Sequence, residues 1–250
     1  MRRRRVLITG ASAGLGAEMT RQLAARGHDL ALCARRTDRL DELRAELMAA
    51  HPERQVAVAA LDVDDHDAVF RVFDELADQL GGLDRVIVNA GLGKGAPVGT
   101  GRFDVNKQTV TTNLVSALAQ CEAAMTHFRA AGSGHLVVVS SMSAMRGMPK
   151  AMTAYAASKA GVAALAEGLR AETLGTGIRV TTLFPGYIES EMNDRVAQST
   201  PLMATTTAGV RAMVRAIERE VASAEVPGWP WRPIGLLLRH APLSVVRRFA

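Results

Sequence analysis

The sequence has few of the features that define disulfide-rich, membrane-spanning or metal-binding proteins. Its two cysteines, Cys33 and Cys121, show neither paired spacing nor a metal-ligand pattern. No run reaches the length of about 18 apolar residues that a membrane span needs. The apolar stretch in the basic start "MRRRRVLITG" is too short for a signal peptide. We therefore expect a cytoplasmic protein with two buried free thiols and no metal site.

Lysine is scarce, although the formal net charge is +5. A basic balance fits an anionic partner but does not choose among a nucleotide, a membrane and a nucleic acid. No recognised nucleic-acid-binding motif accompanies it, so we expect no nucleic-acid partner. The arginines at positions 2–5 enter the first predicted strand, whereas ligands of open α/β sheets bind at the carboxyl ends of strands. We expect these arginines to lie at the wrong end for a cofactor.

Short apolar runs alternate with amphipathic helical stretches along most of the 250 residues. This alternation is typical of repeated βαβ units, and hence of a doubly wound parallel sheet with helices on both faces. Strands are predicted at 5–9, 29–34, 55–61, 85–89, 135–140 and 178–184, and helices at 14–26, 37–50, 66–80, 104–131, 152–174 and 205–222. We predict one Rossmann-like α/β domain over residues 1–250, with 226–250 as a basic, apolar C-terminal extension.

The stretch "TGASAGLG", residues 9–16, ends the first predicted strand and opens the first predicted helix. There, Gly10 can form a tight turn, Gly14 lets the backbone approach a pyrophosphate, and Gly16 allows the helix to pack closely on the strand. The spacing differs from the usual G-x-G-x-x-G of dinucleotide-binding folds. Taken alone, the motif leaves open a simple tight connection.

The end of the second predicted strand carries a clue to the cofactor. A NAD-binding protein would have an acidic residue there to bind the ribose hydroxyls, but this chain has Arg35 and Arg36. A guanidinium pairs with a 2′-phosphate, so the sequence favours NADP. Arg35 is the better candidate because it follows the strand immediately. The alternative is that both arginines only open the next helix in solvent.

Polar and small residues also end the third and fourth predicted strands. Asp62 can accept a hydrogen bond from an adenine amino group, while Asn89, Ala90 and Gly91 offer a path for the ribose and nicotinamide. Each signal is weak alone, because Asp and Gly are common in turns.

Tyr155 and Lys159 lie four residues apart in the helix predicted at 152–174, so their side chains share one face. A nearby ammonium lowers the pKa of a phenol and makes it a usable general acid, although a solvated surface pair is the alternative. The serines of "SSMS", residues 140–143, close the fifth strand, where a hydroxyl can hold a substrate carbonyl.

In order along residues 5–190, the chain has "TGASAGLG", "NAG", Asn113, "SS", "YAASK" and "PGYIES". Together they resemble the short-chain dehydrogenase/reductase family. The resemblance implies a seven-stranded parallel sheet, a NAD or NADP cofactor, a small-molecule carbonyl or alcohol substrate, and a homodimer or homotetramer. It implies NADPH-dependent reduction of a ketone, aldehyde or ketoacyl group, or the reverse oxidation. The alternative from another class is a catalytically silent NADP-binding sensor, which needs no proton donor.

The resemblance also implies residue roles. Tyr155 is expected to donate the proton, Ser141 to polarise the carbonyl, Lys159 to lower the pKa of Tyr155 and bind the ribose, and Asn113 to hold a relay water. The expected cofactor contacts are Gly10, Ser12, Gly14, Leu15, Gly16, Arg35, Arg36, Asp62, Val63, Asn89, Ala90, Gly91, Tyr155, Lys159, Pro185, Gly186, Ile188 and Ser190.

Two departures from the family pattern leave questions. Ser141 lies one residue further from Tyr155 than is usual, which implies a small insertion and makes Ser143 the fallback. In "PGYIES", Ser190 stands where the family often has threonine, and Ile188 would meet the carboxamide through its backbone.

The roles of the segments after the sixth predicted strand are less determined by the sequence. The stretch 189–207 is expected to form a substrate lid, with Met192, Leu202 and Met203 indicating an apolar pocket. Beyond Glu225, the chain is basic and apolar, and its prolines break helical periodicity. This extension packs on the body or a second subunit, contacts an anionic membrane, or covers the substrate pocket.

Overall fold

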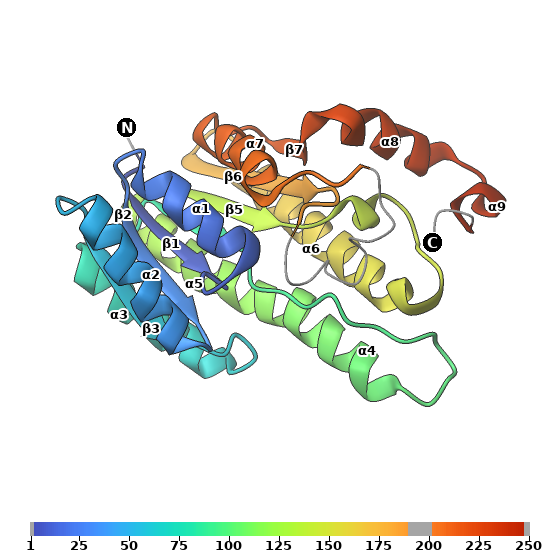
Figure 1. The fold of residues 1–250 in the computed structure, drawn as a ribbon, viewed down its shortest axis with the longest axis horizontal. Helices are drawn as coiled ribbons and strands as arrows, with labels where there is room; N and C mark the ends of the chain where they lie inside the picture. The colour runs from blue at the N-terminus through green and yellow to red at the C-terminus, as the bar shows by residue number, and fades with distance from the viewer. Residues whose placement is uncertain (1–2, 190–201, 248–250) are drawn as a thin grey trace.

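The computed structural model describes residues 3–189 and 202–247, and these form a parallel sheet covered on both faces by helices (Figure 1). The seven strands lie in the order β3-β2-β1-β4-β5-β6-β7. They are β1 Arg5–Thr9, β2 Asp29–Ala34, β3 Val56–Ala60, β4 Arg85–Val88, β5 Ser133–Val139, β6 Gly177–Pro185 and β7 Ser223–Val226. The predicted doubly wound, Rossmann-like fold is confirmed.

Helices follow the strands in the expected alternation. The α-helices are α1 Gly14–Ala24, α2 Thr37–Ala50, α3 His66–Leu80, α4 Phe103–Val110, α5 Ser116–Ala131, α6 Thr153–Glu172, α7 Thr206–Glu218, α8 Gly228–His240 and α9 Leu243–Val246. A π-helical turn, η1 Thr111–Val115, joins α4 to α5, and two 3₁₀ turns, η2 Met142–Met145 and η3 Lys150–Met152, precede α6.

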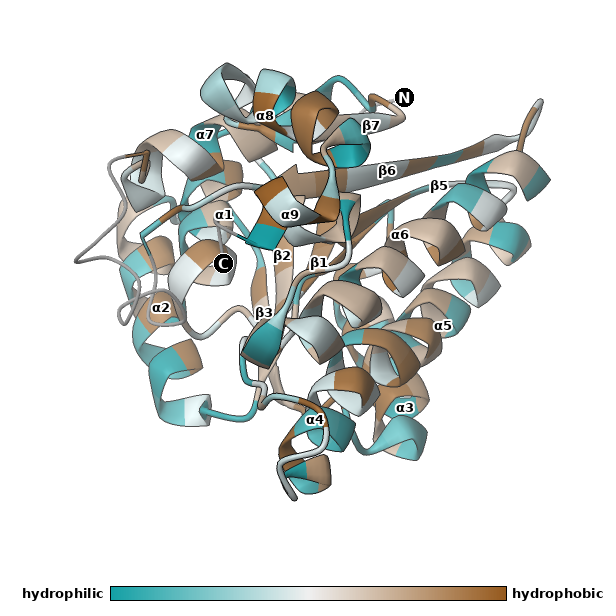
Figure 2. Cartoon of the chain, turned by 90° about the vertical axis from the view of Figure 1, so that its right-hand side faces the viewer, coloured by the Kyte–Doolittle hydropathy of each residue, from teal (hydrophilic) through white to brown (hydrophobic). Residues whose placement is uncertain are grey.

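The strands separate two apolar cores because successive side chains point to opposite faces of the sheet. Leu7 of β1 belongs to the core under α3, α5 and α6, whereas its neighbours Val6 and Ile8 belong to the core under α1, α2 and α7. Figure 2 shows the same layering, with apolar strands between helices whose outer faces are hydrophilic. Cys33 and Cys121 are buried free thiols, as predicted.

A buried polar network holds the amino edge of the sheet. Arg85, which is almost fully buried, donates from Nε to His135 Nδ1 at 2.9 Å and forms an ion pair with Glu218. His135 Nε2 in turn lies 2.9 Å from Thr181 Oγ1. Burial keeps the pKa of His135 well below its usual value, and the charge of Arg85 adds to this effect. The neutral imidazole therefore accepts from Arg85 and donates to Thr181.

The N-terminal arginines that the structure describes also lie at this amino edge. Arg3 pairs with Glu220 at 3.0 Å, and Arg5 pairs with Asp84 at 2.7 Å. They tie the start of β1 to neighbouring segments, away from the carboxyl ends of the strands, as the sequence predicts.

Three elements differ from the sequence predictions. The helix predicted at 104–131 is interrupted by η1. The seventh strand, β7, had no predicted position. The helix α8 forms despite its prolines, with a kink at Trp229, whose backbone is not helical. In the part of the chain that the structure describes, no helix is both long and apolar enough to cross a bilayer.

Candidate functional site

The loop between β1 and α1 needs glycine for two different physical reasons. Gly10 has φ +64°, in the left-handed region that other residues rarely adopt. At Gly16, a Cβ would lie 2.2 Å from the carbonyl oxygen of Gly10, so any side chain would push α1 away from the end of β1. Gly14 opens α1 with φ +53°, and Ser12 and Leu15 are half-buried beside it. The loop keeps the first turn of α1 close to the sheet.

Asn89, at the end of β4, braces this loop. Its Nδ2 donates to the carbonyl oxygen of Thr9 at 3.0 Å. Thr9 Oγ1 accepts from the backbone N–H groups of Asn89 and Ala90 at 3.0 and 3.1 Å. The side chain of Asn89 is therefore occupied in holding β1 and β4 together, and the small residues that follow it leave the edge open.

One end of the candidate site, where β2 and β3 finish, is basic. Arg35 lies 3.9 Å from Asp62, and its side chain is 62% exposed. Arg36 is also exposed, whereas Val63 is buried and packs into the core under α3. The distance between Arg35 and Asp62 is too long for a strong pair, so the guanidinium is available to another anion.

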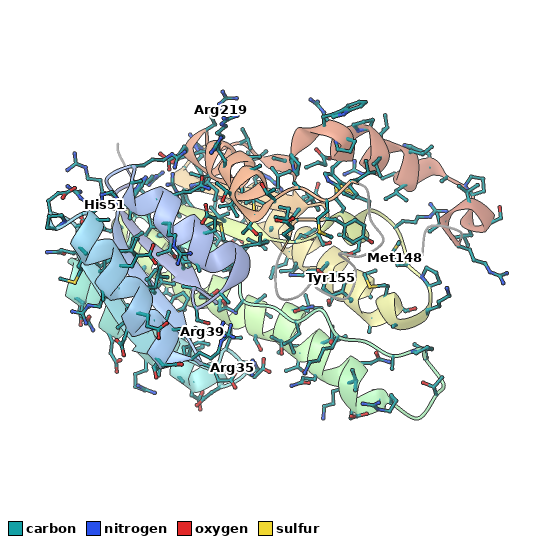
Figure 3. All side chains as sticks on the ribbon, in the orientation of Figure 1. Arg35, Arg39, His51, Met148, Tyr155 and Arg219 are labelled. Carbon is teal, nitrogen blue, oxygen red and sulfur yellow. The ribbon has the colours of Figure 1, made fainter. Side chains whose placement is uncertain are left out.

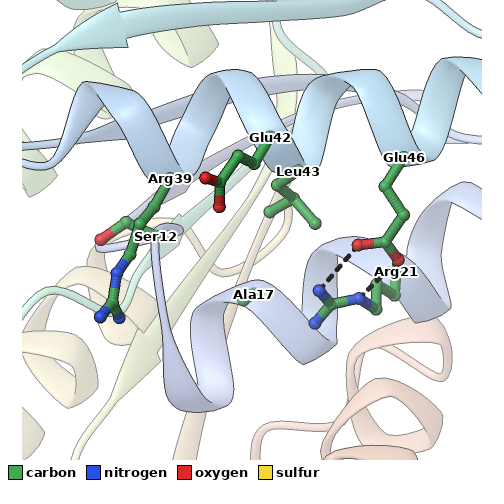
Figure 4. Close-up of a pocket in the computed structure, with 7 residues that line it drawn as sticks. All are labelled: Ser12, Ala17, Arg21, Arg39, Glu42, Leu43 and Glu46. Carbon is green, nitrogen blue, oxygen red and sulfur yellow. Dashed lines mark hydrogen bonds and ion pairs between the residues drawn. The ribbon is translucent and has the colours of Figure 1, made fainter.

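A groove of about 400 Å³ adjoins this basic end, between α1 and α2. Its lining residues are Ser12, Ala17, Arg21, Arg39, Glu42, Leu43 and Glu46. Figure 4 shows Arg39 extending from α2 beside Ser12, while Arg21 and Glu46 form an ion pair further along. The sequence predictions missed Arg39. Its signal is its place in the first turn of the helix that follows Arg35.

Asn113 lies in the π-helical turn η1, a rare conformation that often occurs at functional sites. Its Oδ1 accepts from the backbone N–H of Leu92 at 2.7 Å, and its Nδ2 donates to the carbonyl of Leu92 at 2.9 Å and to Ser158 Oγ at 3.2 Å. A Cβ at Gly91 would lie 3.0 Å from Asn113 Oδ1 and 3.4 Å from Lys159 Nζ. Asn113, Gly91 and Lys159 therefore meet at one place.

The side chains of Tyr155 and Ser141 lie close enough for the Ser141 hydroxyl to act on the phenol. Tyr155 is half-buried in the first turn of α6, and Figure 3 shows it apart from Arg35 and Arg39. Burial raises the pKa of Tyr155, the Ser141 hydroxyl opposes this, and the nearby Tyr187 adds to it. The phenol is therefore protonated at neutral pH.

Lys159 lies one turn along α6 from Tyr155 and is buried. Its Nζ donates to the carbonyl of Val139 at 3.0 Å, and burial lowers its pKa to about 8. Burial dominates the pKa of Tyr155, and the Lys159 ammonium bonds a backbone carbonyl, so the lowering of that pKa by Lys159 stays a prediction.

Of the two candidate serines, Ser141 is the one that reaches Tyr155. Ser143 instead donates to Ser141 Oγ, from its hydroxyl at 3.0 Å and its backbone N–H at 3.2 Å. The sequence implies one residue more than is usual in the family between Ser141 and Tyr155. In the structure this stretch contains η2, η3 and Lys150, whose φ is +58°.

The segment after β6 is held by the C-terminal part of the chain. Pro185 ends β6, and the N–H of Gly186 donates to the carbonyl of Val226 at 3.0 Å. The indole of Trp231 lies against Gly186 and meets the ring of Tyr187 edge-on, with centroids 5.4 Å apart. The indole Nε1 has no hydrogen-bond partner among the described residues. Sequence reasoning gave Tyr187 and Trp231 no site role, although aromatic residues make up only 4% of the chain.

Ile188 and the stretch predicted to form a substrate lid follow Tyr187 in the sequence. The buried side chain of Ile188 packs on Gly209 of α7, and its backbone pairs with Ala204. Ser190 and Met192 lie outside the described residues, as does most of the lid. Leu202 is exposed and Met203 half-buried. In the described part, no group of three or more His, Cys, Asp or Glu residues is placed to hold a metal ion.

Comparisons with known proteins agree on one family. The family model described as short chain dehydrogenase matches residues 4–201. An uncharacterized oxidoreductase of Mycobacterium tuberculosis is 57% identical over 248 residues, covering 99% of this chain and 98% of that protein. Levodione reductase has a structure similar to this one, with a TM-score of 0.83 at 25% identity, covering 92% of this chain and 98% of that chain.

A short chain dehydrogenase from Burkholderia cenocepacia, solved in complex with NADP, has a TM-score of 0.80 at 27% identity, covering 90% of this chain and 96% of that one. The doubly wound sheet and the polar groups at its carboxyl edge define an oxidoreductase of the class that binds a nicotinamide cofactor. The chain belongs to the short-chain dehydrogenase/reductase family.

Proposed function

We propose that this protein is an NADPH-dependent reductase of an apolar ketone, aldehyde or ketoacyl compound. One observation carries the proposal. The Ser141 hydroxyl lies beside the protonated Tyr155 phenol, with the buried Lys159 one turn further along the same helix. A silent binding protein has no use for a tyrosine hydroxyl and a serine hydroxyl brought together at this edge. The arrangement fits proton donation to a substrate carbonyl.

The residues around the edge fit a dinucleotide. Any side chain at Gly16 would collide with the carbonyl of Gly10, so the start of α1 stays close enough to the sheet to receive phosphate groups on its free N–H groups. At Gly91 the lack of a side chain lets Asn113 and Lys159 approach the backbone closely. We infer that the glycine loop holds the pyrophosphate and that Lys159 holds the nicotinamide ribose. When bound, the reduced nicotinamide supplies a hydride.

The chain's own residues supply the proton and the orientation. Ser141 donates a hydrogen bond to the substrate carbonyl, and Tyr155 gives its proton to the same oxygen as negative charge develops there. The phenol of Tyr155 holds its proton at neutral pH and can give it to the developing alkoxide. Asn113 fixes the segment around Leu92 through two backbone hydrogen bonds and so positions Gly91 beside Lys159.

Two sets of side chains support the finer parts of the proposal. Arg35 and Arg39 are exposed at the end of the groove that holds Ser12, and they favour the 2′-phosphate of NADP. Tyr187, Trp231 and Met142 form an apolar cluster next to Ser141, which favours an apolar substrate. The similar protein from Burkholderia cenocepacia was solved with NADP, and levodione reductase is named for a reduction.

A homo-oligomer is part of the proposal. The exposed apolar side chains of Phe103 and Leu118, on α4 and α5, support it because burial against a second copy would remove them from water. Light scattering coupled to size-exclusion chromatography measures the mass directly, and a monomer at micromolar concentration would contradict this part.

The test of the function follows NADPH and NADH oxidation against aliphatic, aromatic, steroid and ketoacyl carbonyls. For the substrates turned over, Tyr155→Phe should lower kcat by about 10² to 10⁴, the usual contribution of a positioned general acid. Thr126→Ala is the matched control. It removes an exposed hydroxyl on α5 that bonds the carbonyl of Glu122, away from Ser141 and Tyr155, and should keep the activity.

Turnover that survives in Tyr155→Phe would overturn the assigned acid. Tight NADPH binding without consumption of any carbonyl in the panel would favour the silent sensor over the reductase.

A further inference from the structure

The C-terminal arm, residues 228–247, carries charge of one sign. The chain has no acidic residue after Glu225, whereas the arm contains Arg232, Arg239 and Arg247. All three are exposed, and none forms an ion pair within the part of the chain that the structure describes. Arg239 points back to the body, since its Nε donates to Met145 Sδ at 3.2 Å, so Arg232 and Arg247 are the arginines that the arm presents outward. The side chain of Glu225 does not neutralise them from the outside, since its Cγ lies near Gly235 on the packed side of α8. The charged side chains on the outer side of the arm are therefore all basic.

One face of α8 is committed to the body of the protein. Trp231 and Gly235, four residues apart, are buried against Gly186 and Met142. At the end of the helix, the carbonyl of Arg239 accepts from Arg146 at 3.0 Å. These contacts fix which side of the helix faces outward.

The opposite side of the arm exposes large apolar side chains. Leu236 lies one helical turn from Arg232, and the exposed fractions are 63% for Leu236 and 59% for Leu237. Trp229 before the helix is 81% exposed, and Leu243 of α9 is 66% exposed. Hydrophobic and hydrophilic segments lie side by side along α8 and α9 in Figure 2. Apolar side chains with a tryptophan among unpaired arginines are typical of a helix that lies in a membrane interface.

We propose that the outer face of the C-terminal arm binds the surface of an anionic bilayer. Charge decides between this occupant and a second copy of the chain. A two-fold contact places the same patch on both partners, so each arginine would face other arginines with no acidic residue of the arm to offset them. An anionic lipid surface offers the complementary charge and accepts the leucines and Trp229 at the depth of the headgroups.

The location of the arm links this surface to the catalytic edge. The helix α8 packs on η2, which directly follows Ser141, and on the segment after β6 through Trp231. This link rests on the proposed function: a bilayer on the outer face of α8 would lie near the edge of the sheet where Ser141 and Tyr155 would act on an apolar carbonyl. Vesicle binding itself needs no catalysis and can be tested separately.

The experiment measures co-sedimentation of the full-length protein with vesicles of phosphatidylcholine alone or of an equimolar mixture with phosphatidylglycerol. Each basic side chain near an anionic surface contributes about fivefold in affinity, so Arg232 and Arg247 together predict binding about 25-fold tighter to the mixed vesicles. Raised salt should weaken this binding. Arg232→Gln should weaken binding to mixed vesicles about fivefold, and the double variant Leu236→Glu/Leu237→Glu should abolish it.

Leu174→Glu is the matched control, because Leu174 is 74% exposed after α6, at the amino edge of the sheet. It should bind vesicles like the wild type. The proposal is overturned if the wild type sediments equally with both vesicles or with neither, or if the double leucine variant binds like the wild type. The proposal is also overturned if the wild type binds no vesicles and the double leucine variant has a lower molecular mass in solution than the wild type. That result would identify the outer face as a contact between two copies of the chain. Thermal unfolding checks that each variant folds, and the salt dependence tests the wild type without any substitution.

Discussion

Replacing Gly186 by alanine would place a methyl group against the indole of Trp231. A Cβ there would lie 2.1 Å from Cε2 and 2.3 Å from Nε1 of Trp231. Carbon atoms in contact stay about 3.5 to 4.0 Å apart, so the indole or the backbone would have to move by more than an ångström. The backbone conformation of Gly186 does not itself require glycine, because its φ is not positive. The whole effect of the substitution should therefore come from Trp231.

Overpacking of this kind costs about 1 to 3 kcal/mol. For a chain of this size, each kcal/mol lowers Tm by about 2 to 4 °C, so Gly186→Ala should lower Tm by about 2 to 12 °C in thermal unfolding. Trp231→Ala removes the obstacle, although it costs about 3 to 5 kcal/mol by itself. In the Trp231→Ala background, Gly186→Ala should cost almost nothing, which gives a coupling of about 1 to 3 kcal/mol.

Gly168→Ala is the matched control. Gly168 is exposed within α6, and a Cβ there would meet nothing within 4 Å. Alanine should stabilise the helix at that position by about 0.5 to 1 kcal/mol. The packing of Trp231 on Gly186 is refuted if Gly186→Ala leaves Tm unchanged, or lowers it equally with and without the indole.

Three further predictions concern charge. The pKa of Lys159 is lowered to about 8 in the folded protein. Between pH 8 and the ordinary lysine pKa the unfolded chain therefore binds more protons, so the free energy of unfolding of the wild type should rise by about 2 to 3 kcal/mol relative to Lys159→Met as pH increases through this range. Parallel curves of unfolding free energy against pH for the two proteins would contradict this. Arg35→Ala should lower the ratio of kcat/KM for NADPH over NADH about 10- to 100-fold by removing one charge-assisted contact, while Arg44→Ala on α2, the helix that follows Arg35, leaves the ratio unchanged. Interactions with His28 and Arg85 hold the pKa of Glu218 at about 2 against the opposing effect of burial, so its stabilisation is present above the ordinary carboxyl pKa and lost as pH falls toward 2. Glu218→Gln should lower the free energy of unfolding by about 2 kcal/mol at pH 7, a value reduced because Glu218 is partly exposed. It should also remove the loss of stability at low pH. Chemical unfolding of wild type and variant at pH 7 and pH 3 measures the two effects.

The sequence predicted most of the sheet because its strands are continuous apolar runs bounded by charged or glycine residues. The predicted bounds of β1, β2, α2 and α3 agree with the structure to the residue. The strand β7 escaped prediction because "SAEV" has only one fully buried side chain, Val226, and is held by pairing with β6. The helix α8 escaped because its prolines mask a helical pattern that packing of Trp231 and Gly235 stabilises.

The candidate site was predictable where it depends on local spacing and not where it depends on distant contacts. The positions of Gly10, Tyr155 and Lys159 follow from a loop after a strand and from one turn of a helix. The direction of the Tyr155 pKa depends on burial by segments far away in the sequence, and local spacing cannot supply it. Arg39 points to the glycine loop only because α2 packs beside α1, which the sequence alone does not fix.

The π-helical turn at Thr111–Val115 changes which face of the long helical segment between β4 and β5 points to the sheet, so α4 and α5 can each face a different part of the molecule. A π turn holds one more residue than an α turn, and one residue corresponds to about 100° of rotation around the helix axis. Deleting a single residue from this turn would restore a continuous α-helix but rotate α4 relative to α5. Asn113 would then turn away from Leu92, or the core residues of α5 would turn away from the sheet. The extra residue thus sets the rotation of α4, which builds the catalytic edge, relative to α5, which builds the core. Natural insertions or deletions at this turn should therefore be far rarer than in the loops on either side.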